Sequence, residues 1–240
     1  MTDEKTTEIT AKTRTALIFR CVIELVLAAV SAVGIALSAA GSDFMGGATT
    51  LLFFTVQSNI TVSLICLVFF ADNLIKLFGG RGFIGKAALM IKYVFTVAIT
   101  ITFLVFFVAL APLLPADYLT SFKNLSLHLI VPLLAICDFF VFDAAAIKLN
   151  AKNCLCGILM PLYYLFFFLV GIPLGFRYLN GDNVAPYFFL DYKTYGWLKI
   201  SKEGIGVVYW CIIMLVFIAG LCFLFLFLTR LRQKPARGEK

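Results

Sequence analysis

The sequence predicts an all-α, polytopic membrane protein that folds as one bundle of six transmembrane helices. Of its 240 residues, 62% are hydrophobic and only 14% are charged, whereas soluble domains contain about 45–50% apolar and about 25% charged residues. The mean hydropathy is +1.01. A surface exposed to water needs far more charge than this chain carries, so the composition excludes a soluble globular domain, a disordered chain and a nucleic-acid-binding domain.

Six apolar runs are each long enough to cross a bilayer, which takes about 20 residues of helix. They lack the period-two alternation of a membrane β-strand and are about twice its length, so each is expected to be a helix. Polar tails at 1–15 and 229–240 flank a single membrane domain at 16–228, and the longest loop, 176–203, is rich in aromatic residues. The predicted spans cover about residues 16–40, 48–70, 88–111, 125–147, 154–175 and 204–228.

The basic residues predict the orientation, because Lys and Arg are retained on the cytoplasmic side of a membrane. Fifteen of the 20 lie in the tails and the second and fourth loops, against five on the other side, so both termini are predicted to be cytoplasmic. The net charge of +7 then serves orientation and attraction to anionic membrane lipids, and we expect no nucleic-acid partner. The short N-tail contains acidic residues, unlike a transit peptide, which favours an integral protein of a prokaryotic plasma membrane.

Charged residues within the predicted spans are few. Arg20 and Glu24 are four residues apart in the first span and are expected to pair along the helix. Asp143 is expected at a helix end, where a charge costs little, and we assign it no chemistry. Lys92 is counted with the basic residues of the second loop.

The second span begins with an unusual density of polar side chains. Thr55, Ser58 and Asn59 share one helix face at i, i+3 and i+4, and Gln57 lies between them. One interpretation is that these groups hydrogen-bond across helices and hold the bundle together, at about 0.6–2 kcal/mol each. The other is that they line a polar cavity.

His128 is the only histidine in the chain, and it opens the fourth span at about the predicted depth of Thr55. A threonine hydroxyl is a weak nucleophile until a base takes its proton, and neutral histidine suits that task. In the alternative interpretation His128 has a structural role only, and its hydrogen-bonding needs are met by Asn124, one helical turn away. Asp138 follows ten residues later and is turned about 80° around the helix axis from His128, so it is expected to orient a third group or a water, or to be a buried, paired acid.

Three of these features together resemble the androgen-induced protein family, which includes the androgen-dependent regulator of tissue factor pathway inhibitor. The order and spacing are similar over the whole chain, although Phe188 stands where that family has proline. The matching residues are Phe54-Thr55 at the start of the polar second span, Asn124-x-x-x-His128 followed by Pro132 and Asp138, and Tyr187-Phe188-Phe189-Leu190-Asp191 in the long loop.

The resemblance implies a six-span threonine hydrolase of lipid esters, such as fatty acid esters of hydroxy fatty acids. Carried over, Thr55 is the nucleophile and His128 the base. Gln57, Ser58, Asn59, Asn124 and Asp138 are then expected to line a polar cavity, with Asn59, Gln57 or Asn124 as oxyanion donors, and Tyr187 and Asp191 to contact the substrate from a lid.

The expected partners are a lipid or fatty-acyl substrate and the membrane lipids. We expect no cofactor and no metal, since Cys154 and Cys156 lack the four ligands of a structural zinc site. Two alternatives stay open: a non-catalytic lipid-binding or carrier protein of the same fold, and a structural membrane protein.

Overall fold

The computed structural model describes residues 11–41, 47–178, 183–202 and 204–233, and within them six helices are long and apolar enough to cross a membrane. This confirms the number of spans and the all-α class, apart from one two-stranded hairpin. The spans are Thr13–Ala40, Phe54–Leu77, Lys86–Leu113, Phe122–Asp143, Asn153–Gly171 and Val207–Gln233. Most of the two predicted tails lies outside the described residues.

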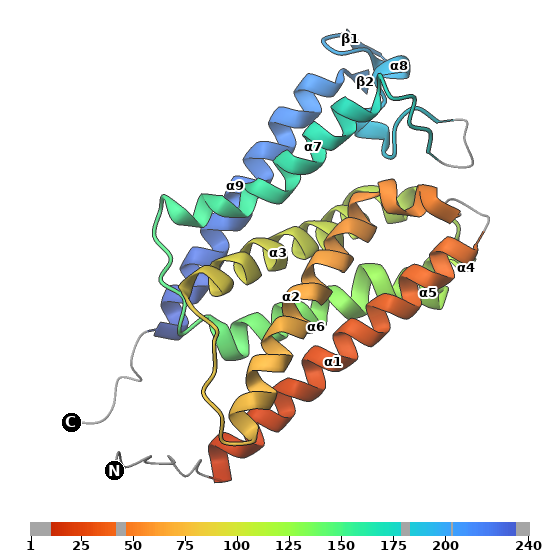
Figure 1. Ribbon diagram of the computed structural model, residues 1–240. Coiled ribbons are helices and arrows are strands. Elements are labelled where there is room, and N and C mark those ends of the chain that lie inside the picture. The colour runs from red at the N-terminus through yellow and green to blue at the C-terminus, as the bar shows by residue number, and fades with distance from the viewer. Residues whose placement is uncertain (1–10, 42–46, 179–182, 203, 234–240) are drawn as a thin grey trace.

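The first three spans pack side by side. Helix α1 (Ala11–Ala40) packs along α2 (Phe54–Leu77), and α2 packs along α3 (Lys86–Val105) (Figure 1). A short 3-10 turn, η1 (Gly47–Leu52), precedes α2. Helix α2 therefore begins later than the predicted span, which places Thr55 in its first turn.

Two of the π-helical turns in the third and fourth spans are each followed within two residues by a proline. The turn η2 (Phe106–Leu110) extends α3, and η4 (Ser126–Ile130) leads into α6 (Val131–Asp138). Pro132 has no N–H to donate to the carbonyl of His128, and the Val131 N–H instead reaches back to Ser126 O. π-Helical turns of this kind are frequent at functional sites.

The remaining elements of these two spans are short. The 3-10 turn η3 (Ala111–Leu113) ends the third span, α4 (Ala116–Thr120) and α5 (Phe122–Leu125) lead into the fourth, and the π-helical turn η5 (Phe139–Asp143) closes it.

The last two spans are η6 (Asn153–Ile158) continued by α7 (Leu159–Gly171), and α9 (Val207–Gln233). Gly157 lets η6 approach α9 and α3 closely, since a Cβ there would lie 2.7 Å from Cys222 Sγ and 3.0 Å from Val97 Cγ1. The fifth span ends in a Schellman motif: Phe176 N donates to Gly171 O, and Gly175 has a φ of 74°.

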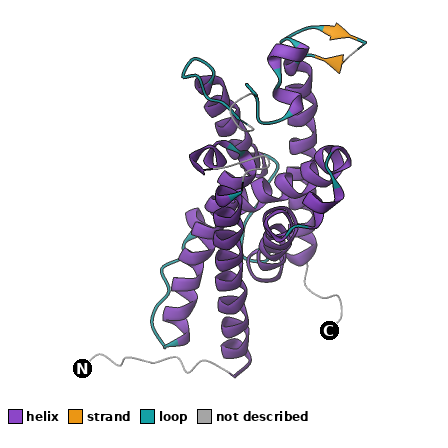
Figure 2. Cartoon of the chain, turned by 90° about the vertical axis from the view of Figure 1, so that its right-hand side faces the viewer, coloured by secondary structure: helices purple, strands orange, loops and turns teal. Residues whose placement is uncertain are grey.

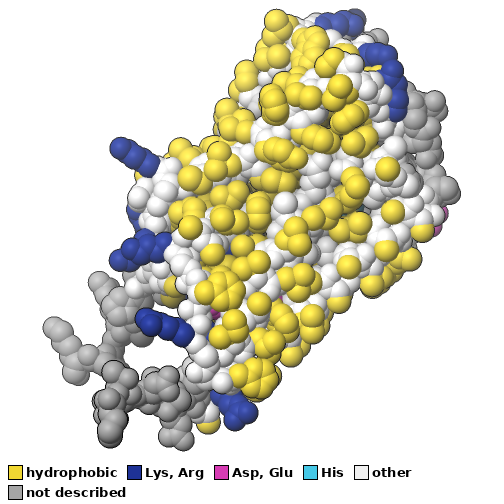
Figure 3. All heavy atoms as spheres, in the orientation of Figure 1, with side chains coloured by type: hydrophobic (Ala, Val, Ile, Leu, Met, Phe, Trp, Pro, Cys, Tyr) yellow, Lys and Arg dark blue, Asp and Glu magenta, His cyan; other side chains and the backbone are white. Residues whose placement is uncertain are grey.

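The connection between α7 and α9 contains η8 (Phe188–Leu190), α8 (Tyr192–Tyr195), and the hairpin of β1 (Ile200–Ser201) and β2 (Gly204–Ile205) (Figure 2). We call the end of the bundle that carries this connection the loop end. The opposite end, where α1 begins and α9 finishes, is the terminal end (Figure 1). Hydrophobic side chains cover the helices between the two ends (Figure 3). Most of the visible Lys and Arg side chains lie at the ends themselves.

Candidate active site

The polar face of α2 is buried and tied to its neighbours. Asn59 Nδ2 donates to Thr55 O at 2.7 Å and to Leu127 O at 3.1 Å, which joins α2 to η4. Ser58 Oγ lies 2.8 Å from Thr102 Oγ1, which joins α2 to α3. These bonds fix the first turns of α2 against both neighbouring spans, so the position of Thr55 is set by three elements.

Thr55 and His128, 73 positions apart in the chain, are in contact. Thr55 Oγ1 lies 3.3 Å from His128 Nε2, and His128 Nδ1 lies 3.1 Å from Asn124 O. A carbonyl oxygen only accepts hydrogen bonds, so Nδ1 carries the proton in the neutral ring and Nε2 keeps its lone pair. The Thr55 hydroxyl therefore donates to Nε2, which is the geometry of a nucleophile and its base.

The imidazole is enclosed. Phe106, on the π-helical turn η2, stacks on it with ring centroids 3.8 Å apart, and His128 is 5% exposed. The π-helical turns η2 and η4 thus meet at this ring. The stacking restricts the ring orientation from one face, while the backbone of Asn124 holds it from its edge.

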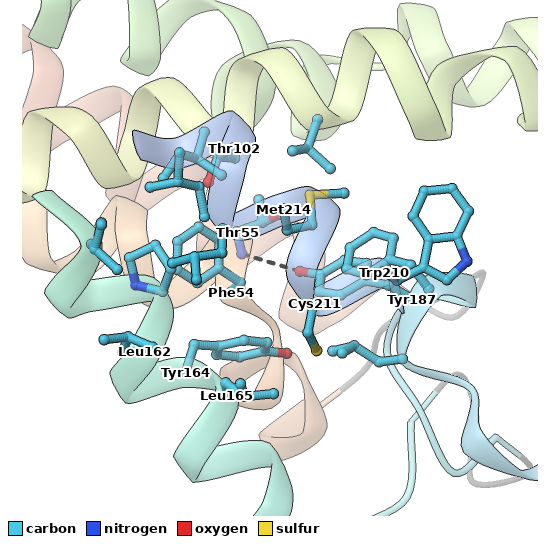
Figure 4. A pocket seen from close by; sticks show the side chains of 18 of the residues that line it. Phe54, Thr55, Thr102, Leu162, Tyr164, Leu165, Tyr187, Trp210, Cys211 and Met214 are labelled. Carbon is cyan, nitrogen blue, oxygen red and sulfur yellow. Dashed lines mark hydrogen bonds between the residues drawn. The ribbon is translucent and has the colours of Figure 1, made fainter. Parts of the chain in front are cut away.

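An apolar pocket of about 130 Å³ lies beside Thr55 (Figure 4). Its walls come from α3 and η2, α7, α9 and η8, with Thr55 supplying one of the few polar groups. His128 is not among the lining residues, because it lies behind Thr55 and Phe106. The lining residues are Phe54, Thr55, Ile101, Thr102, Val105, Phe106, Leu110, Ile158, Pro161, Leu162, Tyr164, Leu165, Tyr187, Phe189, Leu190, Trp210, Cys211, Met214, Leu215 and Ile218.

Tyr187 reaches from the long connection to the start of α2. Thr55 N donates to its hydroxyl oxygen at 3.4 Å, the bond drawn in Figure 4. Its ring stacks on Phe189 with centroids 5.1 Å apart. Burial raises the pKa of Tyr187 above its usual 10, because a phenolate is poorly solvated there. The Tyr187 hydroxyl therefore stays protonated and keeps a hydrogen that it can donate.

Asp191 has a different place from the one expected. Its Oδ1 accepts from the backbone N–H groups of Lys193 and Thr194, both at 3.1 Å, so it caps the short helix α8. It is not among the residues that line the pocket beside Thr55. The contacts therefore give Asp191 a capping role, and its contact with a substrate stays a prediction.

The amides expected to donate to an oxyanion are already engaged. Both hydrogens of Asn59 Nδ2 go to backbone carbonyls, Gln57 Nε2 donates to Leu51 O at 3.0 Å, and Asn124 Nδ2 donates to Leu119 O at 3.0 Å. None of the three amides lines the pocket. Of the polar groups that do line it, the Tyr187 hydroxyl approaches Thr55 most directly. The sequence analysis expected Tyr187 to contact the substrate from a lid but not to approach Thr55, because the loop that carries it has no periodic pattern that predicts its path.

Asp138 lies far from the pocket, about 15 Å from His128 along the helix axis at 1.5 Å per residue. It belongs to a buried charge cluster at the terminal end, which we define as Arg20, Glu24, Lys92, Asp138 and Asp143. Lys92 Nζ contacts the carboxylates of Asp138, Asp143 (2.8 Å) and Glu24 (3.5 Å). The expectation that Asp138 lines the polar cavity is therefore not supported, and its alternative as a buried, paired acid fits the contacts.

The same cluster revises two further expectations. Lys92 is 1% exposed and lies within α3 rather than in a loop, and Asp143 is 2% exposed and accepts two bonds from Arg20, at 2.6 and 2.8 Å. The expected pair of Arg20 and Glu24 is present, with 3.0 Å between Nε and Oε1. A charge inside hydrocarbon is costly unless it is paired, and these spans pair theirs with one another.

Among the described residues, no group of three or more His, Cys, Asp or Glu side chains is arranged to hold a metal ion. The three carboxylates of the charge cluster are instead engaged by Lys92 and Arg20.

Comparisons with protein-family models, with curated proteins and with solved structures found no match to this chain. The candidate site is therefore argued from its own geometry.

Proposed function

We propose that this chain is an intramembrane hydrolase of lipid esters in which Thr55 is the nucleophile and His128 is the general base. One observation carries the proposal: Thr55 lines an apolar pocket, and its hydroxyl lies 3.3 Å from an imidazole nitrogen whose lone pair can accept its proton. The apolar walls suit a hydrocarbon chain, and the polar wall suits its ester group.

The proposed reaction has two halves. In the first, Thr55 Oγ1 attacks the ester carbonyl carbon as its proton moves to His128 Nε2, and the tetrahedral intermediate then expels the alcohol, which takes that proton. In the second, His128 accepts a proton from a water that attacks the acyl-enzyme. The acid is released, and the proton returns to Thr55 Oγ1.

The developing oxyanion needs hydrogen-bond donors. We assign this role to the Tyr187 hydroxyl, in place of the amides of Asn59, Gln57 and Asn124, because it faces the pocket and keeps its proton. The N-terminus of α2 adds a favourable field, since Thr55 is in the first turn of a 24-residue helix and helix N-termini stabilise negative charge.

We further propose that both termini are cytoplasmic and that the loop end, with the pocket near it, is on the outer side of a prokaryotic plasma membrane. The support is the distribution of Lys and Arg along the sequence: without Lys92, which is buried in α3, 14 lie in or beside the tails and the second and fourth loops and five in the other loops. Cysteine accessibility in inverted and right-side-out vesicles tests this orientation, with single cysteines introduced at Lys199 and Lys152 in a cysteine-free background. Modification of Lys199→Cys from the inside would contradict it.

The catalytic test is fatty-acid release from a panel of long-chain esters by purified protein in lipid nanodiscs. Thr55→Ala and His128→Ala are each expected to lower turnover by about 10³-fold or more, while Thr55→Ser, which keeps a hydroxyl, retains measurable activity. Ser63→Ala is the matched control, because it removes a buried hydroxyl from the same helix at a position that does not line the pocket.

Turnover is compared only among variants whose melting temperature equals that of the wild type. Full turnover by Thr55→Ala would refute the mechanism. If the wild type cleaves none of the esters but still binds them, the result would instead favour the non-catalytic lipid carrier.

A further inference from the structure

The pocket beside Thr55 opens sideways, between two spans. Of the described residues that line it, only Leu162 on α7 and Leu215 on α9 are exposed, at 50% and 46%. Both belong to the interior of membrane-spanning helices. In a bilayer the exposed side of such helices faces acyl chains rather than water, so this mouth opens into hydrocarbon.

The loop end of the pocket is covered. Tyr187 and Phe189 stack there, Phe188 packs edge-on against Trp210 with centroids 5.4 Å apart, and Leu190 is 6% exposed. We call Tyr187 to Leu190 together with Trp210 the aromatic cap. Figure 4 shows Tyr187 and Trp210 on one side of the pocket and the α7 residues Leu162 and Leu165 on another. The aromatic cap therefore separates the pocket from the water beyond the loop end.

The dimensions of the pocket suit a hydrocarbon chain. On α9 its lining runs from Trp210 to Ile218, about 12 Å at 1.5 Å of rise per residue. An extended chain advances about 3.3–3.6 Å over three bonds, so this length holds roughly ten carbon–carbon bonds. A longer chain projects through the mouth into the bilayer, where lipid acyl chains surround its remaining methylene groups.

We propose that the substrate enters sideways from the bilayer, between Leu162 and Leu215, and that its class is the ester of a long hydrocarbon chain already dissolved in the membrane. The chain lies along α9, and the ester group reaches Thr55 under the aromatic cap. The identity of the bound group as an ester rests on the proposed function, whereas the sideways entry of a hydrocarbon chain does not.

The test needs no turnover. The chain has two tryptophans, so Trp197→Phe leaves Trp210 as the sole reporter on the pocket wall. A long-chain fatty acid brominated along its chain is titrated into nanodiscs of unlabelled phosphatidylcholine, and quenching of Trp210 fluorescence is followed. We expect saturable quenching. In Leu162→Phe/Leu215→Phe the bulkier rings narrow the mouth, and the apparent affinity is expected to fall by about fivefold or more.

The matched control is Leu169→Phe/Leu224→Phe. It makes the same substitutions on the same two helices, at positions 40% and 49% exposed that do not line the pocket. The two double variants should melt alike, because all four positions are already exposed. Quenching that is unsaturable, or equal in the two double variants, overturns sideways entry.

Ester turnover by the same proteins separates the two proposals. If saturable quenching and its loss at the mouth are found without cleavage of any ester, sideways binding stands and the hydrolase fails. If esters are cleaved equally by both double variants and quenching does not differ between them, the hydrolase stands and the route is wrong.

Discussion

Replacing Lys92 by methionine removes the ammonium on which three buried carboxylates converge. Methionine has a similar length and no charge, so the change isolates the electrostatic loss from packing. Lys92 Nζ lies 2.8 Å from Asp143 Oδ2 and 3.5 Å from Glu24 Oε1, contacts Asp138, and has a side chain 1% exposed. Removing one partner from a buried ionic group costs about 3–5 kcal/mol, because the remaining charge stays buried without compensation.

This cost converts to a melting temperature. For chains of 150–250 residues, 1 kcal/mol corresponds to about 2–4 °C, so Lys92→Met is expected to melt about 6–20 °C below the wild type. The assay is thermal unfolding of purified protein in a mild detergent, followed by tryptophan fluorescence or circular dichroism. Lys86→Met is the matched control, since Lys86 is exposed at the start of the same helix, and its melting temperature should change by less than about 2 °C.

A second variant tests the cause of the loss. Lys92→Met/Asp138→Asn removes one negative charge together with the positive one, so it should recover part of the lost stability, and the double-mutant cycle measures the coupling. A melting temperature for Lys92→Met within about 2 °C of the wild type would refute the inference that the cluster stabilises the bundle through charge pairing.

Four further predictions concern the site and the loop beside it. Tyr187→Phe is expected to lower kcat by about 10²-fold with little change in KM, as for other oxyanion donors, and a fall in KM alone would contradict that role. Because burial raises the pKa of Tyr187 above 10, wild-type turnover should persist as pH rises through the range in which an ordinary tyrosine ionises; an alkaline loss near pH 9 that vanishes in Tyr187→Phe would show the opposite. Asn59→Leu loses two bonds to backbone carbonyls, which should cost about 1–3 kcal/mol in thermal unfolding and slow turnover through misplacement of Thr55; wild-type stability would show that these bonds are not needed. Asp191→Ala removes the cap of α8 and should cost about 1 kcal/mol or less without changing kcat, and a large fall in kcat would restore Asp191 to the site.

Composition and hydropathy were sufficient to predict the membrane class and the number of spans. The polar face at Thr55, Ser58 and Asn59 and the isolated His128 also stood out locally, because polar groups are conspicuous in long apolar runs. The positions of Thr55 and His128 within their spans also predicted that the two residues lie at a similar depth. The structure brings their side chains into contact.

The partners of the other polar residues could not be found in this way. The amides of Asn59, Gln57 and Asn124 donate to backbone carbonyls, one of which, Leu127 O, belongs to another span. No residue pattern encodes which carbonyl a side chain meets. Asp191 caps α8, a helix of four residues that is too short to leave a periodic signal. Lys92 was counted with a loop because it is a basic residue near the start of a span. Its three acidic partners come from spans one and four, so no local pattern indicates that they are close.

The sequence by itself determined that the chain needs a bilayer as its solvent, that it crosses six times, and that a hydroxyl and an imidazole lie at similar depth in two of its helices. Each of these follows from the length and periodicity of segments about 20 residues long. Only the tertiary structure decided that Thr55 faces His128 Nε2, that Tyr187 returns over the start of α2, and that α7 and α9 each supply one exposed residue to the pocket lining. These features depend on how helices distant in sequence rotate and approach one another, and that is set by packing across the whole bundle.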